Sequence, residues 1–156
     1  MTASFSDLSL AATSGRTLAL SDYQGRHLLV YFYPRDNTPG CTQEGQEFAE
    51  AYSEFQALGI DILGVSRDTL KSHEHFKSKL ELPFDLVSDT DETLCQAFDV
   101  IKAKQMYGKP VRGIERSTFL LDPDGQIAKE WRKVSVKGHV QAVLQTIREL
   151  INGPGA

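Results

Sequence analysis

The chain has 156 residues, of which 40% are hydrophobic and 24% are charged, and its formal net charge is −4. This length fits one compact domain over residues 1–156, with a core large enough to need no disulfide staples. No basic stripe interrupts the acidic balance, which argues against nucleic acid and anionic membranes as partners.

The N-terminal segment MTASFSDLSL has neither the positive cluster nor the apolar stretch of a signal peptide. The longest apolar run covers residues 28–33 and is far too short to cross a bilayer. We therefore expect a cytoplasmic protein in a reducing compartment, where the two cysteines do not form a permanent staple.

The first predicted elements are a hairpin and a buried strand. Residues 5–10 and 16–20 flank a turn at 13–15 and predict an N-terminal β-hairpin. The apolar run HLLVYFY, residues 27–33, has the length of a strand and is followed by Pro34, which favours a buried central strand over a helix.

Helices and strands alternate after the loop PRDNTPG. Aromatic residues recur at helical spacing between positions 41 and 58, and Gly59 is a natural stop for that helix. The next predicted elements are a strand at 60–65, a helix capped by Asp68 and running to 80, and a strand at 84–87. Asp89 and Glu92 resemble a capping box for a short helix that contains Cys95. Strands at 117–121 and 126–132 and a helix at 137–151 complete the prediction. This order predicts an α/β fold with a central mixed β-sheet flanked by helices, and the thioredoxin-like fold is one architecture with this order.

A cysteine at the start of a helix is the most informative feature of the sequence. Cys41 follows the loop after the central strand and lies in the first turn of the predicted helix. Unpaired backbone N–H groups and the positive end of the helix dipole favour the nucleophilic thiolate there. Ionisation alone makes only an ordinary reactive cysteine. Attack on an O–O bond also needs donors for the leaving oxygen, such as the Thr38 hydroxyl and an arginine guanidinium.

Two segments resemble one known family. The string PRDNTPGC, residues 34–41, resembles the peroxiredoxin signature Pro-x-x-x-Thr/Ser-x-x-Cys. The longer string YPRDNTPGCTQE, residues 33–44, is similar to the bacterioferritin-comigratory, or peroxiredoxin Q, branch. The segment GIERSTFLLDPDG, residues 113–125, is similar to a strand and turn of the same branch, and Arg116 falls where that branch has its catalytic arginine.

The resemblance implies a thioredoxin-like fold and a thiol peroxidase. Cys41 would be the peroxidatic cysteine, which attacks the hydroperoxide and becomes a sulfenic acid. Thr38 would orient the peroxide, and Pro34 would shield the sulfur from water. Arg116 would hold the thiolate and stabilise the transition state, and Glu44 would tie this arginine in place.

Each of these residues also has a structural explanation. A cysteine at a helix start is often an inert small apolar residue. Thr38 could only cap the helix, and Pro34 could only end the strand. Arg116 could belong to a surface ion pair, and Glu44 could complement the helix dipole.

The match with the branch breaks at the resolving cysteine. Many members carry it five residues after the peroxidatic one, where this chain has Gln46, and others carry it on the next helix, where residues 69–80 contain none. The only other thiol is Cys95, whose spacing to Phe98 suggests a half-buried core position. We therefore favour a one-cysteine mechanism, with a Cys41–Cys95 disulfide, within or between chains, as the alternative.

The resemblance thus implies a thioredoxin-dependent peroxiredoxin that acts in antioxidant defence and redox homeostasis. Its substrate would be a hydroperoxide, and its reductant would be thioredoxin, glutaredoxin or glutathione. We expect no cofactor and no metal, because His73 and His75 point to different helix faces and no C-x-x-C is present. We expect a monomer, with a dimer as the alternative, and we expect Tyr107 and Trp131 to be packing residues.

Two other functions remain to be weighed. A cysteine hydrolase would need a histidine base beside the thiol, and none of the four histidines lies in a recognisable motif. A redox sensor or holdase would form a sulfenic acid slowly, without acceleration by the arginine.

Overall fold

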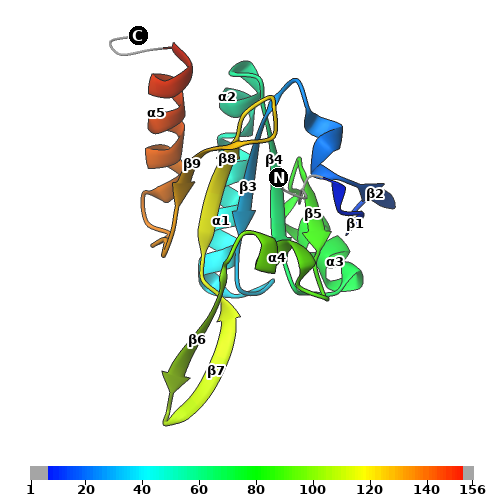
Figure 1. Ribbon diagram of the computed structural model, residues 1–156, viewed down its shortest axis with the longest axis vertical. Helices are drawn as coiled ribbons and strands as arrows, with labels where there is room; N and C mark the ends of the chain where they lie inside the picture. Colours follow the sequence, from blue (N-terminus) through cyan, green and yellow to red (C-terminus); the bar gives the residue numbers. More distant parts are fainter. Residues whose placement is uncertain (1–6, 153–156) are drawn as a thin grey trace.

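A mixed sheet forms the centre of the protein (Figure 1). Within residues 7–152, the part of the chain that this computed structural model describes (104–106 and 152 by backbone alone), seven strands pair in the order β2-β1-β5-β4-β3-β8-β9. The strands of this sheet are β1 (Leu10–Ala12), β2 (Arg16–Leu18), β3 (His27–Phe32), β4 (Ile60–Ser66), β5 (Asp85–Ser88), β8 (Ser117–Leu121) and β9 (Ile127–Trp131). The helices are η2 (Leu20–Tyr23), α1 (Pro39–Glu50), α2 (Tyr52–Ala57), α3 (Leu70–Leu80), α4 (Thr93–Ala97) and α5 (His139–Asn152).

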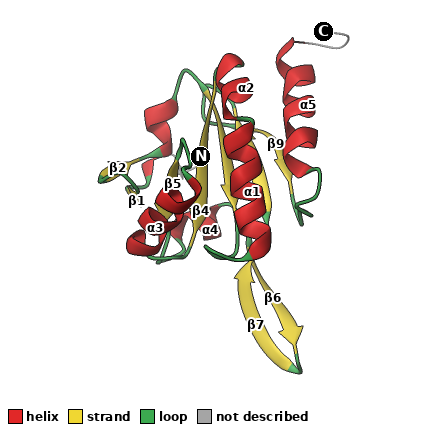
Figure 2. Cartoon of the chain, turned by 180° about the vertical axis from the view of Figure 1, so that it is seen from behind, coloured by secondary structure: helices red, strands yellow, loops and turns green. Residues whose placement is uncertain are grey.

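Alternate residues of β3 enter two separate cores. Leu29 and Tyr31 pack in a core to which α1, α2, α3 and α5 contribute. Val30 and Phe32 pack in a second core with α4 and η2. Because successive side chains of a strand point to opposite faces, the two cores lie on opposite sides of the sheet. Figure 2 accordingly shows α1 in front of the sheet and α4 behind it.

The pairing of β3 determines which loops meet at its carboxyl end. β3 runs parallel to β4 and antiparallel to β8, and Phe32 lies opposite Ser117. The loop after β3 and the residues just before β8 therefore lie at the same edge of the sheet. Cys41 follows that loop and Arg116 immediately precedes β8, so the topology brings the two segments together.

The predicted α/β fold, with a mixed sheet flanked by helices and an N-terminal hairpin, is confirmed. The first strand of the hairpin begins later in the sequence than the predicted strand at residues 5–10. It is β1, because Leu10 and Ala12 are buried and Ala11 pairs with Ser88 of β5. Residues 5 and 6 of the predicted strand lie outside the described residues.

Two predicted helices differ in detail. The helix predicted over 41–58 is interrupted at Ala51, which separates α1 from α2. The α3 helix is capped by Thr69, whose hydroxyl accepts from the backbone N–H of Ser72, and not by Asp68.

No helix within residues 7–152 has both the length and the apolar character that a bilayer crossing requires.

The strands β6 (Ile101–Met106) and β7 (Lys109–Ile114) were not predicted. They form a separate two-stranded hairpin that extends away from the sheet (Figure 1). Its two-residue turn, Tyr107 and Gly108, has positive φ at both positions, as a type I′ turn requires. Tyr107 is 96% exposed, so the expectation of a packing role is wrong there, whereas Trp131 does pack against the first core.

We predict that Gly64→Ala destabilises the sheet by about 1–3 kcal/mol through overpacking. An added Cβ on β4 would lie 2.7 Å from Leu86 Cδ2 and 3.0 Å from Tyr31 Cζ. Urea unfolding measures the effect. Gly45→Ala on α1 is the control, because its Cβ would meet Leu80, Leu82 and Tyr31 at ordinary contact distances of 3.6–3.7 Å. Equal stability of the two variants would contradict this prediction.

Candidate functional site

Cys41 lies in the first turn of α1, at the end of the loop that follows β3. Thr38 occupies the N-cap position in an extended conformation, and its carbonyl accepts the first helical bond from Thr42 N at 2.9 Å. Pro39 follows at N1, where its missing N–H costs nothing. The Cys41 side chain is only 2% exposed. The loop and the cap therefore hold a free thiol under the surface at a helix N-terminus.

Arg116 joins this thiol to a buried carboxylate. Its Nη2 donates to Cys41 Sγ at 3.5 Å, and its Nη1 donates to Glu44 Oε1 at 2.6 Å. Cys41 and Glu44 are three residues apart on α1, so they face the same side of the helix. The Arg116 side chain is 15% exposed and the Glu44 side chain is not exposed. The planar guanidinium thus uses two of its donors at once, which an ammonium could not do in the same geometry.

The close approach of Arg116 depends on Gly40. A Cβ at this position would lie 3.1 Å from Arg116 Nη2, and the guanidinium would have to move by a few tenths of an ångström. The glycine directly before the cysteine therefore makes room for the guanidinium, a role that the sequence analysis did not assign.

Thr38 and Pro34 lie beside this group without bonding to the sulfur. The Thr38 hydroxyl donates to Arg35 O at 2.9 Å and makes no capping bond, so its lone pairs remain available as acceptors. Pro34 is exposed and lines, together with Arg116, a groove of about 510 Å³. Among the described residues, the structure thus brings Cys41, Glu44 and Arg116 into direct contact. Pro34 lines the adjoining groove, and Thr38 stands at the start of the helix that carries Cys41.

Burial raises the pKa of Glu44 to about 7, although the Arg116 guanidinium acts to lower it. Glu44 Oε2 has no hydrogen-bond partner among the described residues, which adds to the cost of its ionisation. When the folded-state pKa of a carboxyl lies above its unfolded-state pKa, folding binds a proton at pH values between the two. The stability that depends on this proton is present at low pH and is lost as the pH rises through about 7.

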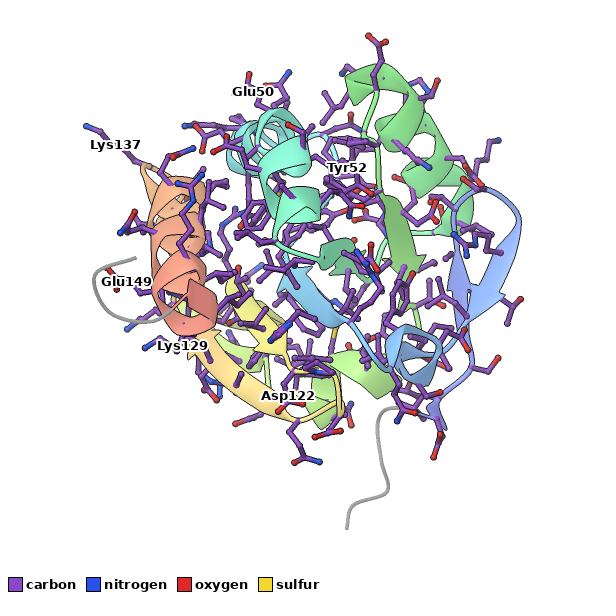
Figure 3. All side chains as sticks on the ribbon, turned by 90° about the horizontal axis from the view of Figure 1, so that it is seen from above. Glu50, Tyr52, Asp122, Lys129, Lys137 and Glu149 are labelled. Carbon is purple, nitrogen blue, oxygen red and sulfur yellow. The ribbon has the colours of Figure 1, made fainter. Side chains whose placement is uncertain are left out.

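We therefore predict that Glu44→Gln changes how stability depends on pH. From about pH 4 to pH 7 the wild type should lose on the order of 3 kcal/mol relative to this variant, because the variant has no carboxyl to ionise. Urea unfolding at a series of pH values measures the difference. The exposed Glu50→Gln on the same helix is the control (Figure 3). Parallel curves for wild type and Glu44→Gln would refute the prediction.

Cys95 lies on the other side of the sheet from Cys41. Cys41 belongs to the first core and Cys95 to the second. Cys95 is fully buried rather than half-buried, and burial together with the nearby Asp89 carboxylate raises the pKa of its thiol. The predicted capping box of Asp89 and Glu92 is wrong, because Glu92 occupies the N-cap position of α4 and binds Arg67 and Arg112. The Asp89 carboxylate, from the preceding loop, accepts from Leu94 N and Cys95 N in the first turn.

A buried polar network that the sequence analysis missed holds the loop before Cys41. Asp36 Oδ1 accepts from the Tyr33 hydroxyl at 2.6 Å, and its Oδ2 accepts from Ser72 Oγ at 2.7 Å. One proton lies between Asp36 Oδ2 and His73 Nδ1, 2.8 Å apart, and His73 Nε2 donates to Val87 O. Ligand atoms of Asp36, His73 and Asp68 lie within 4.8 Å of one another. Protein donors and acceptors already occupy these atoms, so the network fastens the loop to α3 and β5.

The histidines of this region do not serve the thiol as a base. His73 is bonded to Asp36 and Val87, and His139 Nε2 lies 2.8 Å from Thr118 Oγ1. Burial and the charge of Arg116 lower the pKa of His139 to about 4, so this ring is neutral at pH 7. Among residues 7–152, the partner that hydrogen bonds to Cys41 Sγ is Arg116.

Comparison with known proteins finds relatives over most of the chain. The AhpC/TSA family profile matches residues 1–130. Peroxiredoxin Bcp of Xanthomonas campestris pv. campestris is 55% identical over 142 residues, which cover 91% of this chain and 89% of the relative. Peroxiredoxin Bcp of Bacillus subtilis is 49% identical over 144 residues, which cover 92% of each chain.

A solved structure extends the agreement to three dimensions. The bacterioferritin comigratory protein of Xanthomonas campestris, described for its alkyl peroxide reduction activity, is 52% identical to this chain. It superposes with a TM-score of 0.93 and covers 97% of this chain and 96% of its own. The thioredoxin-like fold is therefore confirmed, and the protein belongs to the AhpC/TSA family, in the bacterioferritin-comigratory (peroxiredoxin Q) branch of the peroxiredoxins, which are thiol-dependent peroxidases.

Proposed function

We propose that Cys41 is the peroxidatic nucleophile of this peroxidase and that Arg116 is its principal electrostatic partner. One observation carries the proposal: the Arg116 guanidinium bridges Cys41 Sγ at 3.5 Å and the buried Glu44 carboxylate at 2.6 Å. A fixed positive charge beside the sulfur stays in place as negative charge develops in the transition state. Glu44 holds the guanidinium in one orientation, so little reorganisation is needed during the reaction.

The chemistry follows from this arrangement. The Cys41 thiolate attacks the distal oxygen of the hydroperoxide, an S–O bond forms, and the O–O bond breaks. The leaving alkoxide or hydroxide takes up a proton and departs as an alcohol or water. Arg116 stabilises the charge that shifts toward the leaving oxygen. Cys41 becomes a sulfenic acid.

Thr38 and Pro34 complete the proposed site. The Thr38 hydroxyl donates its hydrogen to Arg35 O, so its lone pairs can accept a hydrogen bond from the O–H of the peroxide. Pro34 lies at the mouth of the groove beside Arg116, where its apolar ring limits the access of water. These two residues orient and shield, whereas Cys41 and Arg116 perform the reaction.

We propose a one-cysteine cycle, because Cys95 is poorly placed to resolve the sulfenic acid. Its side chain is buried in the second core, and the central sheet separates that core from Cys41. A disulfide needs Cα atoms within about 7 Å of each other, so bonding between these residues would require large-scale unfolding. Burial also keeps Cys95 in the less reactive thiol form by raising its pKa.

An external thiol then reduces Cys41, with thioredoxin, glutaredoxin and glutathione as the candidates. Hydrogen peroxide and alkyl hydroperoxides are the proposed substrates, the latter because alkyl peroxide reduction is described for the similar Xanthomonas protein. We propose that the chain acts as a monomer in antioxidant defence. The cytoplasm is the proposed compartment, since two free cysteines suit reducing surroundings.

The test is intact mass after one equivalent of hydrogen peroxide, with and without a sulfenic-acid trap, on wild type and Cys95→Ser. A trapped adduct at Cys41 in both proteins is the expected result. A loss of two hydrogens, or a linked dimer, in wild type alone would establish Cys95 as the resolving residue and overturn the one-cysteine cycle. The absence of any reaction at Cys41 would overturn the assignment of the nucleophile.

A further inference from the structure

We propose that the groove beside Arg116 binds a small thiol with two carboxylates and one ammonium group, of which glutathione is the representative, and that this thiol reduces Cys41. The inference rests on the proposed function, since it assigns the reductant of the same site. The groove has a volume of about 510 Å³, within the range of about 300–1,000 Å³ that is typical of small-molecule sites.

The walls of the groove come from four separate segments of the chain. Pro34 follows β3, and Lys102 and Ala103 belong to β6. The remaining lining residues are Gly113, Ile114, Glu115 and Arg116 at the β7–β8 junction, and Lys133 and Val134 after β9. The base of the unpredicted hairpin thus forms one wall, and the loop after β9 forms another.

The charges of the groove match those of the ligand. Lys102 and Lys133 are two cations that can each pair with a carboxylate, and Glu115 is an anion that can pair with an ammonium group. Lys102 Nζ lies 3.3 Å from Asp99 Oδ2 in an exposed ion pair, which contributes little and which a ligand carboxylate would replace. A neutral peroxide needs none of these three charges. Ala103, Ile114 and Val134 supply apolar surface between the charges. The arrangement therefore fits a zwitterionic dicarboxylate better than it fits a plain alkyl chain.

The loop that carries Lys133 is held in place. Val134 N donates to Arg116 O at 2.9 Å. The Arg132 guanidinium donates to the carbonyls of Phe98 and Asp99, both at 2.9 Å. Lys133 between them adopts a left-handed conformation with φ of 55°. These contacts fix the backbone position of Lys133 relative to Arg116, the residue that contacts the sulfur.

The shape of this region favours a small thiol over a protein. The β6–β7 hairpin extends beyond the sheet (Figure 1), and residues at its base, among them Lys102 and Gly113, line the groove, so the groove lies at the foot of a projection. Cys41 is 2% exposed and does not line the groove, so the incoming thiol must approach alongside Arg116. A flexible tripeptide can enter such a groove, whereas a folded partner would first meet the hairpin.

The reduction is balanced with two thiols. The first thiolate attacks the sulfenic sulfur of Cys41, the S–O bond breaks, and the oxygen leaves as water with the proton of that thiol. The second thiolate attacks the resulting mixed disulfide, which releases the external disulfide and the Cys41 thiolate. The two electrons lost by the two thiols are those that the peroxide accepted.

The experiment measures how fast preformed sulfenic acid disappears, by trapping and intact mass, with three thiols. These are glutathione, its diethyl ester, which lacks both carboxylate charges, and neutral dithiothreitol. The double variant Lys102→Met/Lys133→Met should react with glutathione roughly 10-fold more slowly and should keep its rates with the other two. Lys129→Met/Lys137→Met is the control for net charge, since both lysines are exposed, lie near α5 (Figure 3) and do not line the groove. Its rates should match those of the wild type.

Three results would overturn the proposal. An unchanged glutathione rate in the groove variant would show that the lysines do not recognise the thiol. An equal loss with all three thiols would indicate a general defect, which the rate of sulfenic acid formation by hydrogen peroxide would also reveal. Slower reaction with a carboxylate-bearing hydroperoxide, and not with glutathione, would assign the groove to the peroxide instead. If Cys41 forms no sulfenic acid in the wild type, the proposed function fails first, and this inference falls with it.

Discussion

Arg116→Met is expected to lower the second-order rate constant for hydrogen peroxide by roughly 10²- to 10³-fold, the usual effect of removing one donor aimed at transition-state charge. The variant loses both the contact to Cys41 Sγ and the partner of the buried Glu44 carboxylate. The rate constant of Arg116→Lys should lie between those of Arg116→Met and the wild type. A single ammonium keeps the charge but cannot contact the sulfur and the carboxylate at once, as the guanidinium does. Stopped-flow kinetics of Cys41 oxidation measures all three proteins.

Two further variants separate the position of the guanidinium from its presence. Gly40→Ala keeps Arg116 but places a Cβ 3.1 Å from Nη2, and a displacement of a few tenths of an ångström should lower the rate by about 3- to 10-fold. Arg112→Met removes an arginine of β7 that pairs with Glu92, the N-cap residue of α4, and its rate constant should stay within about 2-fold of the wild-type value. If Arg116→Met reacted as fast as Arg112→Met, the proposed role of Arg116 would be excluded.

Asp36→Ala is expected to have the largest effect on stability, a loss of about 3–5 kcal/mol, because it removes the buried carboxylate at the centre of a hydrogen-bonded network and leaves several buried polar groups without a partner. The Asp36 and His73 side chains are 1% and 0% exposed. Without the carboxylate, the Tyr33 hydroxyl, Ser72 Oγ and His73 Nδ1 would all lose a hydrogen-bond partner. The control is Asp61→Ala, which breaks a more exposed pair with Arg26 and should cost less than about 1 kcal/mol.

The contribution of Asp36 should also depend on pH. Burial acts to raise the pKa of Asp36, but the hydrogen bonds from His73, Tyr33 and Ser72 outweigh it and hold the pKa below its ordinary value. A carboxyl with a lowered folded-state pKa stabilises the protein above its unfolded pKa of about 4, and this stability is lost as the pH falls through the folded value. Urea unfolding of wild type and Asp36→Ala should therefore converge in acid. A constant difference between the two down to pH 2 would be inconsistent with a titrating Asp36.

The sequence was sufficient to predict the sheet, because its central strands are continuous apolar runs and the turns between elements contain Gly or Pro at characteristic positions. The β6–β7 hairpin escaped prediction for a physical reason. Much of β7 is exposed, so no alternation of buried and exposed residues marks it. Its turn has Tyr107 at a position with positive φ, where Asn or Asp would have been the usual signal.

The residues of the candidate site likewise divide into those with a local sequence signal and those without one. Cys41, Thr38 and Pro34 could be proposed as site residues because they share one local motif, and Arg116 because its own segment resembles the family. The Asp36–His73 pair could not, since it joins a loop to a helix 37 positions away and depends on how α3 packs under that loop. A histidine on a helix gives no local signal of the carboxylate it will meet. The role of Gly40 likewise depends on where Arg116 arrives from a distant strand.

The separation of the two cysteines by the sheet has a consequence for how the enzyme would withstand stress. In the proposed one-cysteine cycle, a sulfenic acid at Cys41 would have no thiol of its own chain on the same side of the sheet, so its lifetime would depend on the supply of external thiol. While it persists, a second peroxide molecule competes with that thiol and converts the sulfenic acid to sulfinic acid, which thiols do not reduce. The ratio of peroxide to thiol in the surroundings, rather than any internal step, would then set the dose at which the enzyme inactivates. Such an enzyme would remove peroxide only while thiol is abundant, and a sudden excess of peroxide would inactivate it.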